Sequence, residues 1–139
     1  MIDPLRAATQ IAGAGLDAQS TRLRVVSENL ANAQSTGTAA GSDPYQRKTV
    51  TFQGEFDRLL GASRVAVKSI GNDPTPFEVE YDPGNPAADE DGNVKMPNVN
   101  MMIEMADMRE ATRSYEANLQ MVKQVRTMTT MMLDLLRNG

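Results

Sequence analysis

The chain has 139 residues and a formal net charge of −4, and it contains no histidine and no cysteine. Without these residue types it has no imidazole base, no thiolate nucleophile, no disulfide and no zinc site built from the usual nitrogen and sulfur ligands. Aromatic residues make up 4% of the chain and there are ten methionines, so aliphatic side chains and methionine must form its core. The acidic balance argues against nucleic acid as a partner, because phosphate binding needs a basic face.

The first 33 residues carry an apolar heptad pattern that predicts a long helix. The seam consists of Ile2, Leu5, Ala12, Leu16, Leu23, Val26, Leu30 and Ala33. Pro4 suits a first helical turn and Asp3 is a candidate N-cap, so we expect the helix to begin near residue 4. Gly13 and Gly15 each cost about 1 kcal/mol relative to alanine inside a helix, which weakens its early part.

The middle of the chain predicts loops and a thin β layer. Residues 34–44 are small and polar, as in a helix end followed by a mobile loop. Alternating and β-branched residues predict three short strands, at 48–52, 64–70 and 77–81, and leave open a strand or a helical turn at 54–60. Residues 71–97 hold seven acidic groups and one lysine, a charge of −6, which we interpret as a solvated face or a loop. The run at Asp89 lacks the spacing of a calcium loop, so we expect no metal there.

A second and longer helical pattern follows Pro97, with Asn98 or Asn100 as its N-cap. No glycine or proline occurs from Asn98 to Arg137, which predicts a helix about 60 Å long. Its seam contains Met101, Met105, Met108, Thr112, Tyr115, Leu119, Val122, Arg126, Thr129, Leu133 and Leu136. Arg126, a charged residue within that seam, is our candidate for fixing the helix register.

These patterns predict a mainly α fold with a small β insert. We divide the chain into an N-terminal helix at 1–35, a loop and β-containing segment at 36–97 and a C-terminal helix at 98–139. The two helices are expected to pair as a coiled coil and to be partly disordered in the monomer, because isolated amphipathic helices lack tertiary support. No run of about 18 apolar residues occurs, so we expect no membrane insertion.

The end of the first predicted helix resembles a known family. It reads Ser27-Glu28-Asn29-Leu30-Ala31-Asn32, with Gly37 shortly after, and is similar to the N-terminal signature of the axial proteins of the bacterial flagellum. Two further runs are similar to the short rod subunits of that family: Tyr45-Gln46-Arg47-Lys48, and the stretch from Val99 to Leu119 that contains Glu104, Met105, Met108, Arg113 and Tyr115. The distal-rod and hook members carry much larger inserts than this length allows.

The resemblance implies a structural subunit of the proximal rod of the flagellar basal body. Such a subunit polymerises through its terminal helices into a tube that transmits motor torque and encloses the export channel. The implied partners are further copies of the chain, other proximal and distal rod proteins, the basal-body adaptor and the flagellar type III export apparatus. The implied route is synthesis in the cytoplasm and export without a cleaved signal peptide to the rod in the periplasm, which replaces the cytosolic location that composition alone suggests.

We expect the subunit interface to comprise seam and signature residues: Leu16, Leu23, Val26, Asn29, Leu30, Asn32, Gly37, Met105, Met108, Arg113, Tyr115, Leu119, Val122, Leu133 and Leu136. Arg47 and Lys48 are interpreted either as a partner-facing basic patch or as ordinary solvated charge. We expect no enzymatic activity, no catalytic or metal-binding residue and no cofactor. Two alternatives stay open: another short flagellar rod subunit, or a non-flagellar coiled-coil adaptor or chaperone.

Overall fold

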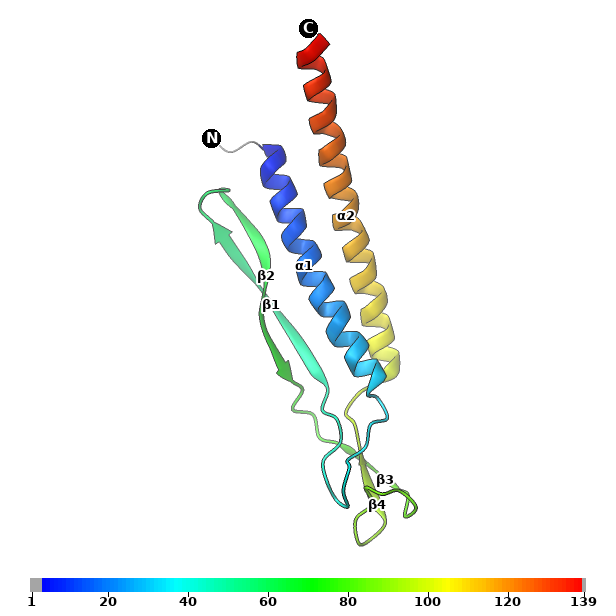
Figure 1. Cartoon of the computed structure of the whole chain (residues 1–139). Helices are drawn as coiled ribbons and strands as arrows, with labels where there is room; N and C mark the ends of the chain where they lie inside the picture. Colours follow the sequence, from blue (N-terminus) through cyan, green and yellow to red (C-terminus); the bar gives the residue numbers. More distant parts are fainter. Residues whose placement is uncertain (1–3, 139) are drawn as a thin grey trace. The chain divides into compact units, whose positions relative to one another are not determined.

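The computed structural model describes residues 4–138 and confirms the mainly α fold with a small β insert (Figure 1). The elements are α1 (Pro4–Ala31), β1 (Lys48–Asp57), β2 (Ala62–Asn72), β3 (Glu78–Tyr81), β4 (Asn93–Met96) and α2 (Met101–Asn138). The expected helix start at residue 4 is confirmed. The seam residue Ile2 and the candidate N-cap Asp3 lie outside the described residues.

The chain forms two compact units. One unit contains the described parts of Met1–Leu23, Thr51–Ser69 and Glu110–Gly139. The other contains Arg24–Val50 and Ile70–Arg109. Each unit therefore holds parts of both helices.

In the first unit, α1 lies between the β1–β2 hairpin and α2 (Figure 1). The buried side chains here are small, namely Ala12, Ala18, Ala111 and Val125. Gly15 is also buried, and a Cβ atom at this position would lie only 2.6 Å from Oδ1 of Asn118 on α2. Gly15 is therefore not merely a weak point of the helix, because its missing side chain lets the two helices approach closely.

The buried line on α2 differs from the predicted seam. The buried residues Glu104, Ala111 and Val125 share a spacing of seven or its multiple, and they flank the half-buried positions Met108, Tyr115 and Val122. Other positions of the predicted seam do not lie in the helix contact: Met105, Thr112 and Arg126 are exposed and Leu119 is half-buried. Arg126 is therefore not the polar residue inside the helix contact.

The β1–β2 hairpin extends further than expected. Strand β1 continues to Asp57, so the alternative of a helical turn at 54–60 is wrong. The turn comes at Arg58–Gly61, where Oδ1 of Asp57 accepts hydrogen bonds from the backbone N–H groups of Leu59 and Leu60. Gly61 has a φ of 62°, a conformation that favours glycine.

The second unit contains the antiparallel pair β3–β4, with Glu78 opposite Met96 and Tyr81 opposite Asn93. Strand β4 was not predicted from the sequence, although burial alternates along its residues and Val94 is buried in the core. The turn before β4 requires Gly92, which has a φ of 82° and whose Cβ would lie 2.8 Å from the Tyr81 ring.

Asparagines lie at the C-terminal end of α1 and at the N-terminal end of α2. Oδ1 of Asn100 accepts hydrogen bonds from the N–H groups of Met102 and Ile103, so Asn100, not Asn98, is the N-cap of α2. After the end of α1, Nδ2 of Asn32 donates to the Glu28 carbonyl and its Oδ1 accepts from the Ser35 hydroxyl.

Candidate functional site: a buried polar cluster and exposed apolar helix surface

The amide of Asn29 lies at the centre of a polar cluster in the second unit. Asn29 is in the last turn of α1 and only 1% exposed. Its Nδ2 donates to the Lys48 carbonyl at 2.9 Å and to Oε2 of Glu104 at 3.1 Å. Its Oδ1 accepts from the Lys48 N–H at 2.9 Å and from the Tyr45 hydroxyl at 2.8 Å. All four hydrogen-bonding positions of the amide are used within the chain.

Glu104 continues the cluster from the first turn of α2, and its side chain is fully buried. One carboxylate oxygen accepts from Asn29, and the other accepts from Nε of Arg47. Arg47 also donates through Nη1 to Oδ2 of Asp73 at 3.1 Å. A buried carboxylate is tolerated only when it is paired and hydrogen-bonded, and the cluster meets both conditions.

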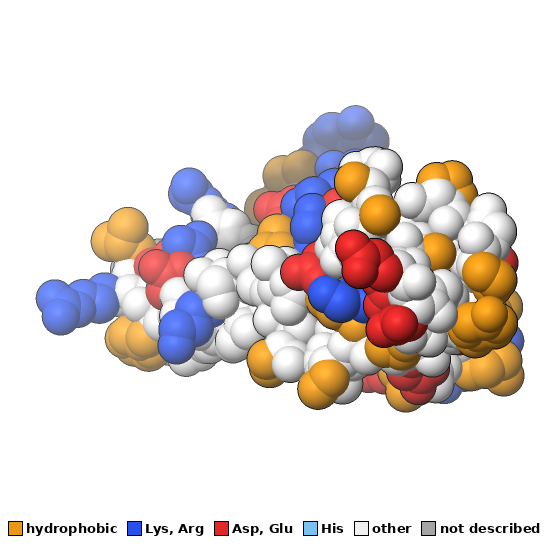
Figure 2. All heavy atoms as spheres, turned by 90° about the horizontal axis from the view of Figure 1, so that it is seen from below, with side chains coloured by type: hydrophobic (Ala, Val, Ile, Leu, Met, Phe, Trp, Pro, Cys, Tyr) orange, Lys and Arg blue, Asp and Glu red, His pale blue; other side chains and the backbone are white. Residues whose placement is uncertain are grey.

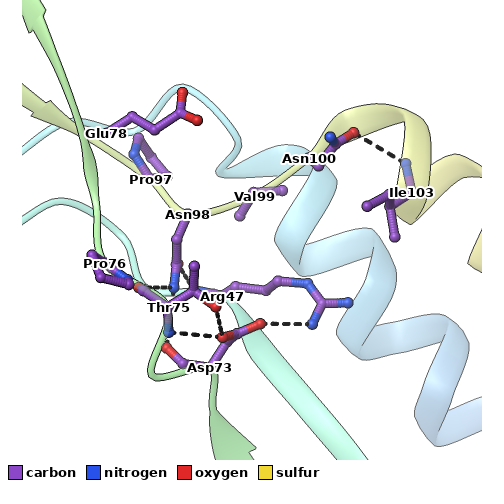
Figure 3. Close-up of a pocket in the computed structure, with 10 residues that line it drawn as sticks. All are labelled: Arg47, Asp73, Thr75, Pro76, Glu78, Pro97, Asn98, Val99, Asn100 and Ile103. Atoms are coloured by element: carbon purple, nitrogen blue, oxygen red, sulfur yellow. Dashed lines mark hydrogen bonds and ion pairs between the residues drawn. The ribbon is translucent and has the colours of Figure 1, made fainter.

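Asn98 joins the residues before β1 to those after β2. Its Oδ1 accepts from the Arg47 N–H at 2.7 Å, and its Nδ2 donates to the carbonyls of Asp73 and Thr75. Figure 3 shows Asn98 pointing toward Thr75, with the Arg47 side chain extended past it to Asp73. These residues line a shallow pocket of about 390 Å³, together with the apolar groups Pro76, Pro97, Val99 and Ile103, the N-cap Asn100 and Glu78.

Burial, hydrogen bonds and charges within the cluster shift three pKa values. Burial, the Glu28 charge and the Glu104 charge raise the pKa of the Tyr45 phenol. For Arg47, burial acts to lower the pKa, but hydrogen bonds and charges from Glu104 and Asp73 outweigh it, and the pKa is raised. Hydrogen bonds from Thr75, with the neighbouring Arg47, lower the pKa of the Asp73 carboxyl. Arg47 and Asp73 therefore both favour their charged forms.

Arg47 and Lys48, for which the sequence left open a partner-facing patch or solvated charge, both form ion pairs within the chain. Arg47 pairs with Glu104 and Asp73, and Nζ of Lys48 pairs with Glu28 on α1. The same runs that carried the family resemblance supplied Tyr45, Arg47 and Glu104, but only the fold brings them to Asn29.

Several predicted interface residues serve the internal structure. Asn29 and Val26 are buried within the chain, and Asn32 bonds to its own helix end. Gly37 is needed where the loop turns back, because a Cβ there would lie 2.7 Å from the Ser42 carbonyl oxygen. For these four, internal contacts explain the residue type without a partner.

The other predicted interface residues are partly or fully open. The half-buried ones are Leu16, Leu23, Leu30, Met108, Tyr115, Leu119 and Val122, whereas Met105, Arg113, Leu133 and Leu136 are exposed. They lie on the flanks of the helix contact or beyond it. The structure thus leaves these side chains accessible, and their role in an interface stays a prediction.

The C-terminal part of α2 presents an uncovered apolar surface. From Arg126 to Arg137 every side chain is exposed. Leu133 is 61% exposed and Leu136 80%, and Met131 and Met132 exceed half. Met128, Met131 and Met132 also border an apolar hollow of about 400 Å³ with Pro4 and Leu5. Apolar surface of this extent is typical of a protein interface.

Two residues of the acidic stretch, Asp82 and Asp89, accept hydrogen bonds within turns. Oδ1 of Asp89 accepts from the N–H groups of Asp91 and Asn93, and Asp82 accepts from Asn85. Figure 2, which views the chain from the β3–β4 side, shows acidic side chains gathered on this face beside scattered apolar ones. Within residues 4–138 no group of three or more acidic residues is placed to hold a metal ion. In the same range, neither helix is long and apolar enough to cross a membrane.

Comparison with known proteins gives one consistent family. A family model described as "Flagellar basal body rod FlgEFG protein C-terminal" matches residues 90–135. A flagellar basal-body rod protein FlgC of Agrobacterium fabrum is 62% identical over 136 residues, covering 98% of each chain. The FlgC of Salmonella typhimurium is 43% identical over 85% of this chain and 87% of its own length. The FlgC of Borreliella burgdorferi is 36% identical over 85% of this chain and 88% of its own.

Proposed function

The chain belongs to the FlgC family of flagellar basal-body rod proteins, and on that premise we propose that it polymerises into the rod through the helix surfaces that its own fold leaves uncovered. Its function is that of a structural subunit of the basal body. The family favours this role over that of a coiled-coil adaptor or chaperone. The proposal concerns which surfaces make the assembly.

The exposed apolar end of α2 is the observation that carries the proposal. Twelve consecutive residues from Arg126 to Arg137 contribute no buried side chain, although Met128, Met131, Met132, Leu133, Leu135 and Leu136 are among them. Helix order in water normally depends on burying an apolar face. A second chain that covered this surface would supply that burial.

A charge introduced into this surface tests the proposal. In Leu133→Asp and Leu136→Asp the monomer should stay folded, with a change in unfolding free energy within about 0.5 kcal/mol, because both positions are exposed. Incorporation into rods should be lost, because an unpaired carboxylate would be buried between subunits. The readouts are the amount of the chain in detergent-extracted basal bodies and the swarming radius.

Gln124→Asp is the matched control, since it adds the same charge at an exposed polar position of the same helix. It should assemble normally. Normal basal bodies in both leucine variants would contradict the proposal.

We further propose, from the family, that the assembled tube belongs to the proximal rod, transmits motor torque and encloses the export channel. Its neighbours would be further copies, other rod proteins and the basal-body adaptor. Delivery would use the flagellar type III apparatus, without cleavage of the N-terminus. As a rod subunit, the chain would act without a catalytic residue or cofactor.

A further inference from the structure

Asn29 and Glu104 are the only buried polar residues of the described chain that bond to each other, and they join the end of α1 to the start of α2. We propose that they, together with Arg47, fix the axial register of α1 against α2. In doing so they would determine which residues of each helix remain available to a neighbouring subunit. This last consequence rests on the proposed function, whereas the register itself does not.

The apolar helix contact is poorly suited to fix the register alone. On α2 the buried residues Glu104, Ala111 and Val125 and the half-buried Asn118 recur every seven positions. Gly15, Ala18 and Val25 on α1 are likewise small or β-branched. A slide of one heptad, about 10 Å along the axis, would place Gly15 opposite Ala111 or Val125 in place of Asn118, with no large side chain in the way.

The polar cluster, in contrast, has one arrangement that satisfies it. Asn29 needs the Lys48 N–H and carbonyl, the Tyr45 hydroxyl and a Glu104 oxygen at once. Any slide would leave the buried amide and carboxylate without these partners, which is strongly unfavourable. A buried polar residue in a helix seam specifies register in the same way.

Helices α1 and α2 are each continuous over residues that belong to both units. The contact of Gly15 with Asn118 offers a way to read the register. Cγ of Asn118 lies 2.8 Å from the position of a Cβ on Gly15, which suits a disulfide between cysteines at these positions. The chain has no cysteine of its own to interfere.

The experiment uses the purified full-length monomer carrying Gly15→Cys and Asn118→Cys, with the products of mild oxidation mapped by peptide mass spectrometry. Two companion proteins carry Gly15→Cys with the partner cysteine one heptad away, as Ala111→Cys or Val125→Cys, and also Asn118→Ala, so that the Asn118 amide does not clash with the cysteine at position 15. With Asn29 and Glu104 intact, we expect the 15–118 disulfide to form at least about tenfold faster than either shifted pair, equivalent to about 1.4 kcal/mol.

Replacing the cluster by Asn29→Leu with Glu104→Leu should reduce this preference to within about twofold while the circular dichroism stays helical, since apolar replacements of a buried polar pair are often tolerated. Asn32→Ala, which removes bonds only at the end of α1, is the control and should keep the tenfold preference. An unchanged preference in the double-leucine protein would overturn the proposal, because small-residue packing would then suffice.

Glu104→Gln tests the same point if the double variant does not fold. Glu104 accepts at both oxygens, from Arg47 and from Asn29, whereas glutamine offers one acceptor and turns its NH₂ toward a donor. The preference for the 15–118 disulfide should fall measurably, and an unchanged value would overturn the proposal. The readout needs no assembly, so a failure of polymerisation and a failure of register are distinguished.

Discussion

The carboxyl of Asp73 is the partly exposed end of the polar cluster, and it makes the stability of the fold depend on pH. Hydrogen bonds from Thr75 and the neighbouring Arg47 lower its folded-state pKa below the ordinary value of 3.8. The unfolded chain therefore binds the proton more readily, and the stability that Asp73 contributes is present above the unfolded pKa and lost as pH falls through the folded one.

We expect Asp73→Asn to lower the unfolding free energy at pH 7 and to flatten its decline below about pH 4. Urea unfolding between pH 2.5 and 7 measures both effects. Asp91→Asn, at an exposed residue of the β3–β4 turn, is the control and should follow the parent curve. A parent-like acid decline in Asp73→Asn would show that other carboxyl groups dominate.

The members of the cluster could be singled out from the sequence, but their grouping could not. Asn29, Tyr45, Arg47 and Glu104 all stand in the runs that carried the family resemblance. Their hydrogen bonds span from 16 to 75 residues along the chain, and no local periodicity reports such a contact. Asn29 was accordingly expected at the subunit interface, whereas the fold uses all its hydrogen bonds internally.

At the scale of elements, the two long helices followed from the sequence because their apolar period is sustained and their ends carry Pro4 and Asn100. The second half of β1 could not be predicted from the sequence, because its side chains are exposed from Gln53 to Phe56 and show no alternation between two faces. The buried line along α2 also escaped prediction. It includes Ala111 and a charged residue, Glu104, which a count of large apolar residues passes over.

Gly13 and Gly15 look equivalent in the sequence but should respond oppositely to substitution. Nothing lies within 4 Å of a Cβ built on Gly13, so Gly13→Ala should raise the unfolding free energy by up to about 1 kcal/mol through helix propensity. In Gly15→Ala the new methyl would displace the Asn118 amide, whose Nδ2 donates to the Ser114 carbonyl at 2.9 Å.

The displacement should cancel or reverse the propensity gain at Gly15. Thermal and urea unfolding of the two single variants, each compared with the parent, measure the difference. Equal stabilisation by both alanines would mean that the helices do not approach closely at Gly15.

At the scale of the whole molecule, burial is distributed unevenly along α2. Glu104, Ala111 and Val125 are buried, and beyond Val125 no side chain up to Arg137 is. A helix with no buried face has little to stabilise it in water, whereas a helix tied by packed and hydrogen-bonded side chains resists local opening. We therefore expect the monomer disorder predicted from the sequence to be concentrated in residues 126–137.

Hydrogen exchange on the free chain and on purified rods tests this expectation. Amides of 104–125 should be protected in both samples, while those of 126–137 should exchange rapidly in the monomer and slow by at least about a hundredfold in the rod, equivalent to about 2.7 kcal/mol. Leu133→Asp monomer should match the parent monomer, because the side chain contacts little before assembly. Uniform protection along the whole of α2 in the free chain would show that the helix needs no neighbour to be ordered, and that its exposed methionines and leucines do not couple folding to polymerisation.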